Sequence, residues 1–103
     1  MHTMQIVQSD VFTAWLDNVK DERAAARIVT RIRRMEIGNA GDVRSVGDAV
    51  SEIRIDYGPG YRVYFTRRGM TLVILLCGGD KGSQSKDIMT AKRLANEWSG
   101  QNG

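Results

Sequence analysis

The first third of the chain has the periodicity of helices. Residues 4–8 alternate roughly between apolar and polar, which predicts a short first strand. Ser9 or Asp10 then offers an N-cap for an amphipathic helix, because the apolar residues that follow have the i, i+3, i+4, i+7 spacing. These apolar residues are Phe12, Trp15, Leu16 and Val19.

A second helix is predicted from Asp21 to Gly38, since glycine is favoured just beyond a helix end. Its apolar stripe consists of Ala25, Ile28, Ile32 and Met35. Another face of the same helix carries Arg23, Arg27, Arg31 and Arg34. The two helices form an αα-hairpin with a very short connection.

The middle of the chain has the two-residue period of strands. A turn at 39–42 precedes a short candidate strand at 43–46, and residues 50–57 then alternate cleanly. After a turn at 58–60, residues 61–66 alternate again. The alternation predicts one polar face made of Arg62, Tyr64 and Thr66. A second turn at 67–69 leads to residues 70–77, which are almost all apolar and predict a central strand covered on both faces.

The C-terminal part is predicted to be a loop and a helix. Residues 78–84 are rich in glycine and polar side chains, and Ser83 or Ser85 would cap the helix that follows. The buried stripe of that helix is predicted to contain Ile88, Ala91, Ala95 and Trp98. Residues 1–3 and 99–103 are expected to be mobile. We therefore expect one α+β domain over residues 1–103, in the order β-α-α-β-β-β-α, with an antiparallel meander.

Composition excludes several classes of protein. One cysteine in 103 residues excludes an internal disulfide framework and a cysteine-rich zinc site. No apolar run approaches the ~20 residues of a membrane span, and no basic segment followed by an apolar stretch opens the chain. A cytoplasmic location, no membrane partner and no cofactor are therefore expected.

Charge is distributed unevenly. The net charge is +3, but residues 1–57 hold eight basic and nine acidic side chains, whereas residues 58–103 hold seven basic and three acidic. Eleven of the fifteen cations are arginine, whose planar guanidinium grips phosphate with two hydrogen bonds. A polyanionic partner such as nucleic acid is one interpretation, and an ordinary solvated surface is the other.

Familiar catalytic and metal-binding sets are absent from the sequence. His2 is the only imidazole, and Cys77 ends an apolar strand. The glycines at 78, 79 and 82 are not followed, at the right spacing, by the Lys-Ser/Thr pair of a phosphate loop. No group of residues has metal-ligand spacing, so no metal site is predicted.

A cationic polar patch remains. Arg54 and Arg62 lie on adjacent predicted strands, with Tyr64 two residues beyond Arg62. Lys81 follows the next strand, and Lys86 opens the last helix. Such a group could bind a phosphodiester and stabilise the phosphorane formed when a 2′-hydroxyl attacks it. The alternative is that Arg54 and Arg62 form solvated ion pairs with acidic neighbours, namely Glu52, Asp56 or Asp80.

Several motifs resemble those of a known family. They are Gly41-Asp42-Val43, Val46-Gly47, Glu52-Ile53-Arg54-Ile55, Gly58-Pro59-Gly60-Tyr61-Arg62-Val63-Tyr64-Phe65, Leu75-Leu76-Cys77-Gly78-Gly79-Asp80-Lys81, Gln84 and Lys86-Asp87-Ile88. Together they resemble the phage Gp49-like, or addiction module killer protein, group of the RelE/ParE toxin superfamily, which is HigB-like. The resemblance spans the chain from the first helix to Trp98.

This resemblance implies a fold, partners and site residues. It implies a RelE-like fold and a type II toxin neutralised by a cognate antitoxin, expected to be a helix-turn-helix protein. RelE and HigB relatives cut mRNA on the ribosome, so the leading expectation is a metal-independent endoribonuclease that inhibits translation and arrests growth. Arg62, Lys81 and Arg54 would be catalytic, and Tyr64, Lys86, Arg67 and Arg68 would bind RNA.

One departure from the family pattern bears on the mechanism. Ribosome-dependent relatives often carry tyrosine or histidine at the start of the last helix, where this chain has Lys86-Asp87-Ile88. Asp87 or Lys81 would then have to replace that residue. The alternative function is that of ParE relatives, which poison DNA gyrase by binding it without catalysis.

Overall fold

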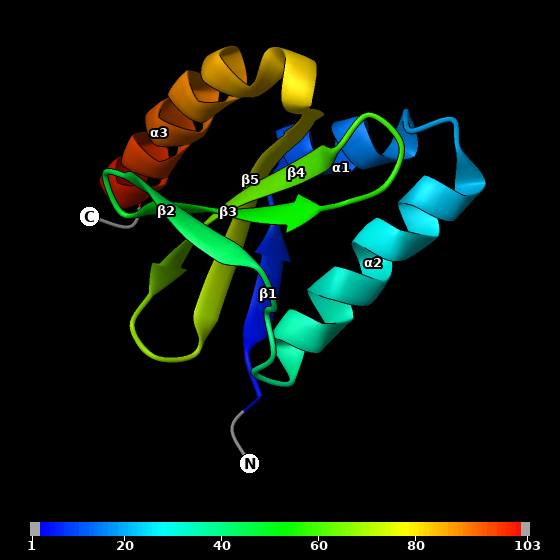
Figure 1. Ribbon diagram of the computed structural model, residues 1–103. Coiled ribbons are helices and arrows are strands. Elements are labelled where there is room, and N and C mark those ends of the chain that lie inside the picture. Colours follow the sequence, from blue (N-terminus) through cyan, green and yellow to red (C-terminus); the bar gives the residue numbers. More distant parts are fainter. Residues whose placement is uncertain (1–2, 102–103) are drawn as a thin grey trace.

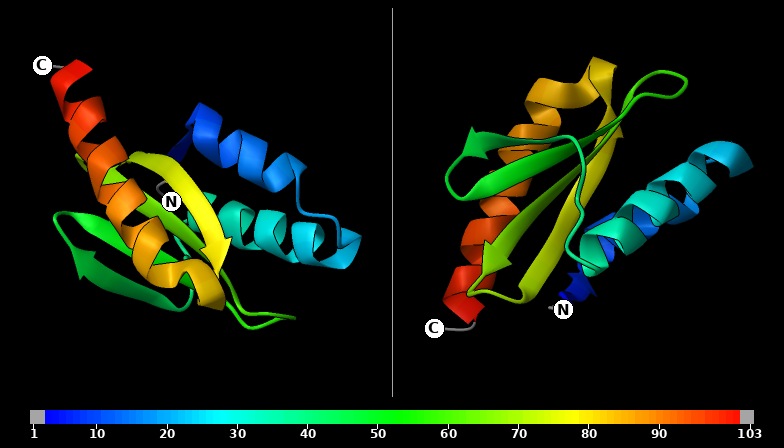
Figure 2. Two further views of the ribbon diagram at one scale, coloured as in Figure 1. Left: turned by 90° about the horizontal axis from the view of Figure 1, so that it is seen from above. Right: turned by 60° about the horizontal axis from the view of Figure 1, so that its bottom comes forward.

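The protein is an α+β structure with a five-stranded sheet between helices (Figures 1 and 2). A computed structural model describes residues 3–101. The elements in chain order are β1 (Gln5–Gln8), α1 (Asp10–Asp17), α2 (Glu22–Glu36), β2 (Val43–Gly47), β3 (Val50–Ile55), β4 (Tyr61–Arg68), β5 (Leu72–Asp80), a 3-10 turn (Lys81–Ser83) and α3 (Gln84–Gln101). The predicted class and order are confirmed, with the short strand at 43–47 as an additional member of the sheet. The arrangement is consistent with the RelE-like fold that the resemblance implies.

The sheet is mixed rather than purely antiparallel. Its strand order is β1-β5-β4-β3-β2; β1 runs parallel to β5, and every other neighbouring pair is antiparallel. The meander prediction is therefore correct for β2 to β5. Alternation alone gives no information about the partner of β1, because a parallel pairing joins segments far apart in sequence.

The N-terminal helices are capped by side chains. Ser9, rather than Asp10, caps α1: its Oγ accepts a hydrogen bond from the Phe12 amide at 3.0 Å and donates one to the Leu76 carbonyl at 2.6 Å. Asp21 caps α2 through the amides of residues 23 and 24. Ser9 thus fastens the start of α1 to the middle of β5.

Two cores lie on opposite faces of the sheet. The α1 and α2 face is filled by Phe12 and Ile28 against apolar side chains of β3, β4 and β5. The α3 face is filled by Tyr64, Leu76 and Leu94 with their neighbours. Strand β5 contributes to both cores, as its unbroken apolar sequence predicts.

The polar face predicted for β4 is buried, which corrects the sequence-based expectation. Arg62, Tyr64 and Thr66 are exposed by only 5%, 0% and 2%. The physical reason is α3, which packs across β4 and β5 on this side (Figure 2, left). Alternation identifies which side chains share a face, but not whether another element covers that face.

The predicted glycine-rich loop is also corrected, because β5 continues through Gly78 and Gly79 to Asp80. A β-bulge opposite Tyr64 and Phe65 turns both Leu76 and Cys77 towards the α3 core. Beyond it, a Cβ on Gly78 would overlap the Trp15 ring, and one on Gly79 would overlap the Asp87 carboxylate. Both glycines are therefore strand residues that permit close approach from either side.

The last helix is preceded by a 3-10 turn that the sequence analysis did not predict. Asp80 caps this turn: its carboxylate accepts hydrogen bonds from the amides of Gly82 and Ser83 at 2.8 and 3.2 Å. Helix α3 then begins at Gln84, directly after Ser83, one of the two residues predicted to precede it. Residues 99–101, expected in a mobile tail, form the last turn of α3; residues 1, 2, 102 and 103 lie outside the described residues. Within residues 3–101, no helix is long and apolar enough to span a membrane.

Candidate functional site

Three predicted catalytic residues line one pocket. The pocket has a volume of about 300 Å³ and lies where β3 ends, β4 begins and β5 runs into the 3-10 turn. We call it the cationic pocket, and it is lined by Asp42, Arg54, Ile55, Asp56, Gly60, Tyr61, Arg62 and Lys81. The structure therefore brings Arg54, Arg62 and Lys81 together, although 27 positions separate the first from the last.

Strand register and a tight turn produce this convergence. Arg54 and Arg62 are direct cross-strand partners in the β3–β4 ladder. Tyr61 pairs with Asp80 at the end of β5, and the Asp80 cap then turns the chain so that Lys81 follows at once. Gly60 has a φ of +83°, which favours glycine, and its Cα lies beside both Arg62 and Lys81.

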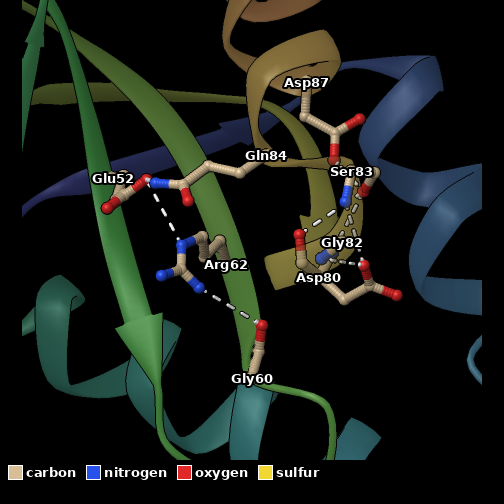
Figure 3. A network of polar contacts seen from close by, with 8 residues as sticks. All are labelled: Glu52, Gly60, Arg62, Asp80, Gly82, Ser83, Gln84 and Asp87. Carbon is tan, nitrogen blue, oxygen red and sulfur yellow. Dashed lines mark hydrogen bonds and ion pairs between the residues drawn. The ribbon is translucent and has the colours of Figure 1, made fainter.

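Arg62 forms an ion pair with Glu52 almost out of contact with water (Figure 3). Its Nε lies 3.6 Å from Oε2 of Glu52, and the two side chains are exposed by only 7% and 1%. The Gln84 amide donates to the same Glu52 oxygen at 3.3 Å, and Nη1 of Arg62 donates to the Gly60 carbonyl at 3.4 Å. The anticipated Arg62–Glu52 pair is thus present, but it is buried instead of solvated.

Tyr64 is part of the same buried polar cluster and is not available to stack on a base. Its hydroxyl and Oε1 of Glu52 are both buried without a hydrogen bond of normal geometry. Burial, followed by the negative charges of Glu52 and Asp87, raises the pKa of Tyr64 above its usual range. Tyr64 is thus a packed strand residue in the free protein, because α3 covers this position.

Asp87 is engaged in a local contact beside the turn. It accepts a hydrogen bond from Ser83 and lies over Gly79, as Figure 3 shows for the Asp87 and Ser83 side chains. It does not line the cationic pocket. The carboxylates that line the pocket belong to Asp42 and Asp56. The sequence analysis had considered Asp56 as an ion-pair partner, but it had not considered Asp42 as a site residue. Asp42 is brought there by the hydrogen bond from the Arg54 amide to its carbonyl at 3.2 Å.

The predicted RNA-binding residues do not gather at this pocket. Arg67 and Arg68 lie at the far end of β4, where they line a different cavity of about 680 Å³ together with Lys92 and Arg93. Arg68 also donates to the Ala95 carbonyl at 2.9 Å. Lys86 is exposed in the first turn of α3 and lines neither cavity. Over the part of the chain that the structure describes, no group of three or more His, Cys, Asp or Glu side chains is placed to hold a metal ion.

Comparison with known proteins places the chain in a family. The family model described as phage-derived protein Gp49-like (DUF891) matches residues 14–97, which include every residue of the cationic pocket. The chain belongs to the Gp49-like family. The membership agrees with the resemblance to addiction-module toxins related to RelE, and it is consistent with a toxin of a toxin–antitoxin system.

One relative is close in sequence. An uncharacterized protein of Haemophilus influenzae (strain ATCC 51907 / DSM 11121 / KW20 / Rd) is 53% identical over 95 residues, covering 92% of this chain and 96% of the relative. No solved structure matches the chain.

Proposed function

We propose that the protein is the toxin of a type II toxin–antitoxin system and acts as a ribosome-dependent mRNA endonuclease of the HigB-like kind. The observation that carries this proposal is the convergence of Arg54, Arg62 and Lys81 on the cationic pocket. Family membership supports a toxin, and three cations in one small pocket support a phosphodiester as the group that it binds.

The chemistry is cleavage of RNA by its own 2′-hydroxyl. The 2′-oxygen attacks the adjacent phosphorus and gives up its proton. The bond to the 5′-oxygen of the next nucleotide breaks, and that oxygen takes up a proton from water as it leaves. The products are a 2′,3′-cyclic phosphate and a 5′-hydroxyl. Arg62, oriented by Glu52, would bind the phosphate, while Lys81 would stabilise the charge that develops on its oxygens. Asp42 and Asp56 are the carboxylates in the pocket that can accept the 2′-hydroxyl proton.

Primer extension on mRNA after induction of the protein, without its antitoxin, tests the proposal. We expect cleavage at defined sites in translated messages, lowered on the order of 100-fold by Lys81→Ala. Lys81 is exposed and forms no ion pair within residues 3–101, so this change should leave the fold intact. Lys20→Ala, which removes an exposed lysine that does not line the cationic pocket, is the matched control. Growth arrest with intact mRNA would refute the nuclease.

A second candidate is a gyrase poison that binds its target without catalysis. The burial of Arg62 and Tyr64 favours it, because these side chains have little surface for a substrate in the free protein. Induction would then cause gyrase-dependent DNA cleavage and an SOS response while messages stay intact. Unchanged supercoiling and no SOS response would exclude it.

A further inference from the structure

Four arginines form a ridge along α2. Arg23, Arg27, Arg31 and Arg34 follow the i, i+4, i+8, i+11 spacing, which places them on one face of the helix. At a rise of 1.5 Å per residue, neighbours four apart are about 6 Å apart along the axis. They line a cavity of about 620 Å³ between α2 and the end of β3. We call this cavity the arginine groove, and its other lining residues are Ala26, Thr30, Ile55 and Asp56.

The charges of the groove are uncompensated. Four guanidinium groups face one carboxylate, that of Asp56. Within residues 3–101, none of the four arginines forms an ion pair, whereas Arg62, Lys92 and Arg93 do. Like charges four residues apart on a helix destabilise it slightly. The ridge is therefore a concentrated positive field that favours an anionic ligand.

Two of the arginines are held in place by the protein. Arg31 donates from Nη1 to the Arg54 carbonyl at 2.8 Å and from Nη2 to the Ala40 carbonyl at 3.1 Å. Gly41 leaves room for this guanidinium, since a Cβ there would lie 2.8 Å from Nη2. Arg27 stacks on the Tyr57 ring, with its guanidinium carbon 4.6 Å from the centroid. A ligand would therefore meet a partly preorganised set of donors.

The groove continues into the cationic pocket. Ile55 and Asp56 line both cavities. Arg31, in the groove, hydrogen-bonds to the backbone of Arg54, in the pocket. Figure 1 shows the N-terminal half of α2 on the same side of the molecule as the turn between β3 and β4. The two cavities are thus adjacent, with the arginines of α2 on one side of Ile55 and Asp56 and with Arg54 and Lys81 on the other.

We propose that the arginine groove binds the sugar–phosphate backbone of single-stranded RNA and directs it into the cationic pocket. Binding in the groove needs only the surface just described, whereas delivery to the pocket rests on the proposed nuclease function. Arginine side chains repeated along a groove are the usual way to follow a phosphate backbone.

A folded protein partner suits this groove less well, because protein interfaces are centred on apolar or aromatic anchors. The large exposed apolar side chains all lie outside the groove; within residues 3–101 they are Val11, Ile37, Val43, Met70 and Met89. An acidic, extended polypeptide is the alternative ligand that the same charge could attract.

Fluorescence anisotropy with a labelled 2′-O-methyl oligouridylate tests the groove alone, since this probe keeps the phosphates but has no 2′-hydroxyl to react. The test variant is Arg23→Ala/Arg27→Ala. The control is Arg33→Ala/Arg44→Ala, which removes the same charge from exposed positions outside the groove. Melting temperatures of both variants check that each is folded.

We expect the logarithm of the binding constant to fall linearly with the logarithm of salt concentration for the unmodified chain. The test variant should lose about 1.4 from that slope, because each phosphate contact on a single strand contributes about 0.7. Its affinity at low salt should fall at least about tenfold, and the control should change by less than about twofold.

Two results would overturn the proposal. Equal losses in both double variants would mean that binding reflects net charge and not the groove. Unchanged RNA binding, with binding of poly-glutamate lost only in the test variant, would assign the groove to an acidic polypeptide. Because the probe cannot be cleaved, neither result bears on the nuclease, which the Lys81→Ala assay in cells decides separately.

Discussion

Glu52 and Arg62 are oppositely charged groups that the fold withdraws from water. Removing two charges from water costs several kcal/mol each, and their attraction offsets that cost only while both are present. Gln84 and the Gly60 carbonyl supply additional hydrogen bonds to the pair. Glu52 therefore has a structural role towards Arg62 whatever the pocket binds.

Changing one member of this pair should be more harmful than changing both. We expect Glu52→Leu to destabilise the protein by about 3–5 kcal/mol, because it leaves the Arg62 charge buried alone. The double variant Glu52→Leu/Arg62→Leu should recover at least half of that loss. Urea unfolding of the single and double variants measures both effects. A single-variant cost below about 1 kcal/mol would show that Arg62 can reach water in solution.

Cys77 is a second residue whose chemistry is governed by its surroundings. Burial, and then the charge of Asp87, raises the pKa of its thiol to about 12. Each unit of pKa lowers the thiolate fraction about tenfold. We expect Ellman's reagent at pH 8 to modify Cys77 at least about 100-fold more slowly in the native protein than in urea. Comparable rates would contradict the buried position.

At the scale of elements, β5 determines how closely its neighbours pack. Gly78 and Gly79 have no side chains, so residues of the helices lie directly against the strand backbone there. Trp15 of α1 lies against Gly78, and Asp87 of α3 lies against Gly79. The helices can lie this near to the sheet only because neither residue has a side chain.

Adding a methyl group at Gly78 should therefore push α1 away from the sheet. We expect Gly78→Ala to cost about 1–3 kcal/mol of stability through overlap with Trp15. Gly82→Ala is the control, because a Cβ there would lie 3.2 Å from a single Asp80 oxygen at an exposed turn. Thermal unfolding, with Trp15 fluorescence as the local probe, compares the two. Equal melting temperatures would refute the close approach.

These elements also show how far sequence reasoning reaches. Periodicity located every helix and strand, because one buried face imposes a period of 3.6 or 2. It assigned Gly78 and Gly79 to a loop, although they belong to β5. Glycine is common in loops, but it also occurs in strands where another element packs closely against the backbone. Periodicity placed Arg54, Arg62 and Lys81 on neighbouring segments, which register then joined into a pocket. It could not decide whether Tyr64 is packed or exposed, because covering by α3 is a property of the tertiary arrangement.

At the scale of the whole molecule, the α3-side core contains two groups that resist ionisation. Tyr64 and Cys77 both pack there, and the pKa of each is raised. The native state therefore keeps both protons at a pH where the unfolded chain releases them. Their contribution to stability is complete below about pH 8.5 and is lost progressively as the pH rises towards 12.

Alkaline unfolding should reveal this linkage. We expect the free energy of unfolding to fall by up to about 1.4 kcal/mol per pH unit for each group, beginning near pH 9 for Cys77 and near pH 10 for Tyr64. In the variant Cys77→Ala, the free energy of unfolding should fall less steeply with pH, because the thiol no longer contributes. Urea titrations at a series of pH values provide the measurement. A slope that is the same with and without the thiol would mean that Cys77 ionises freely in the native protein.

The parallel pairing of β1 with β5 has a consequence for folding during synthesis of the chain. Residues 5–8 leave the ribosome early, but their partners, residues 72–75, are made more than sixty codons later. Strand β5, which lies between β1 and β4, is thus the last strand synthesised, and Lys81 follows it directly. A nascent or prematurely terminated chain lacks the middle of both cores and the complete pocket. Translation must therefore pass residue 81 before the pocket can form.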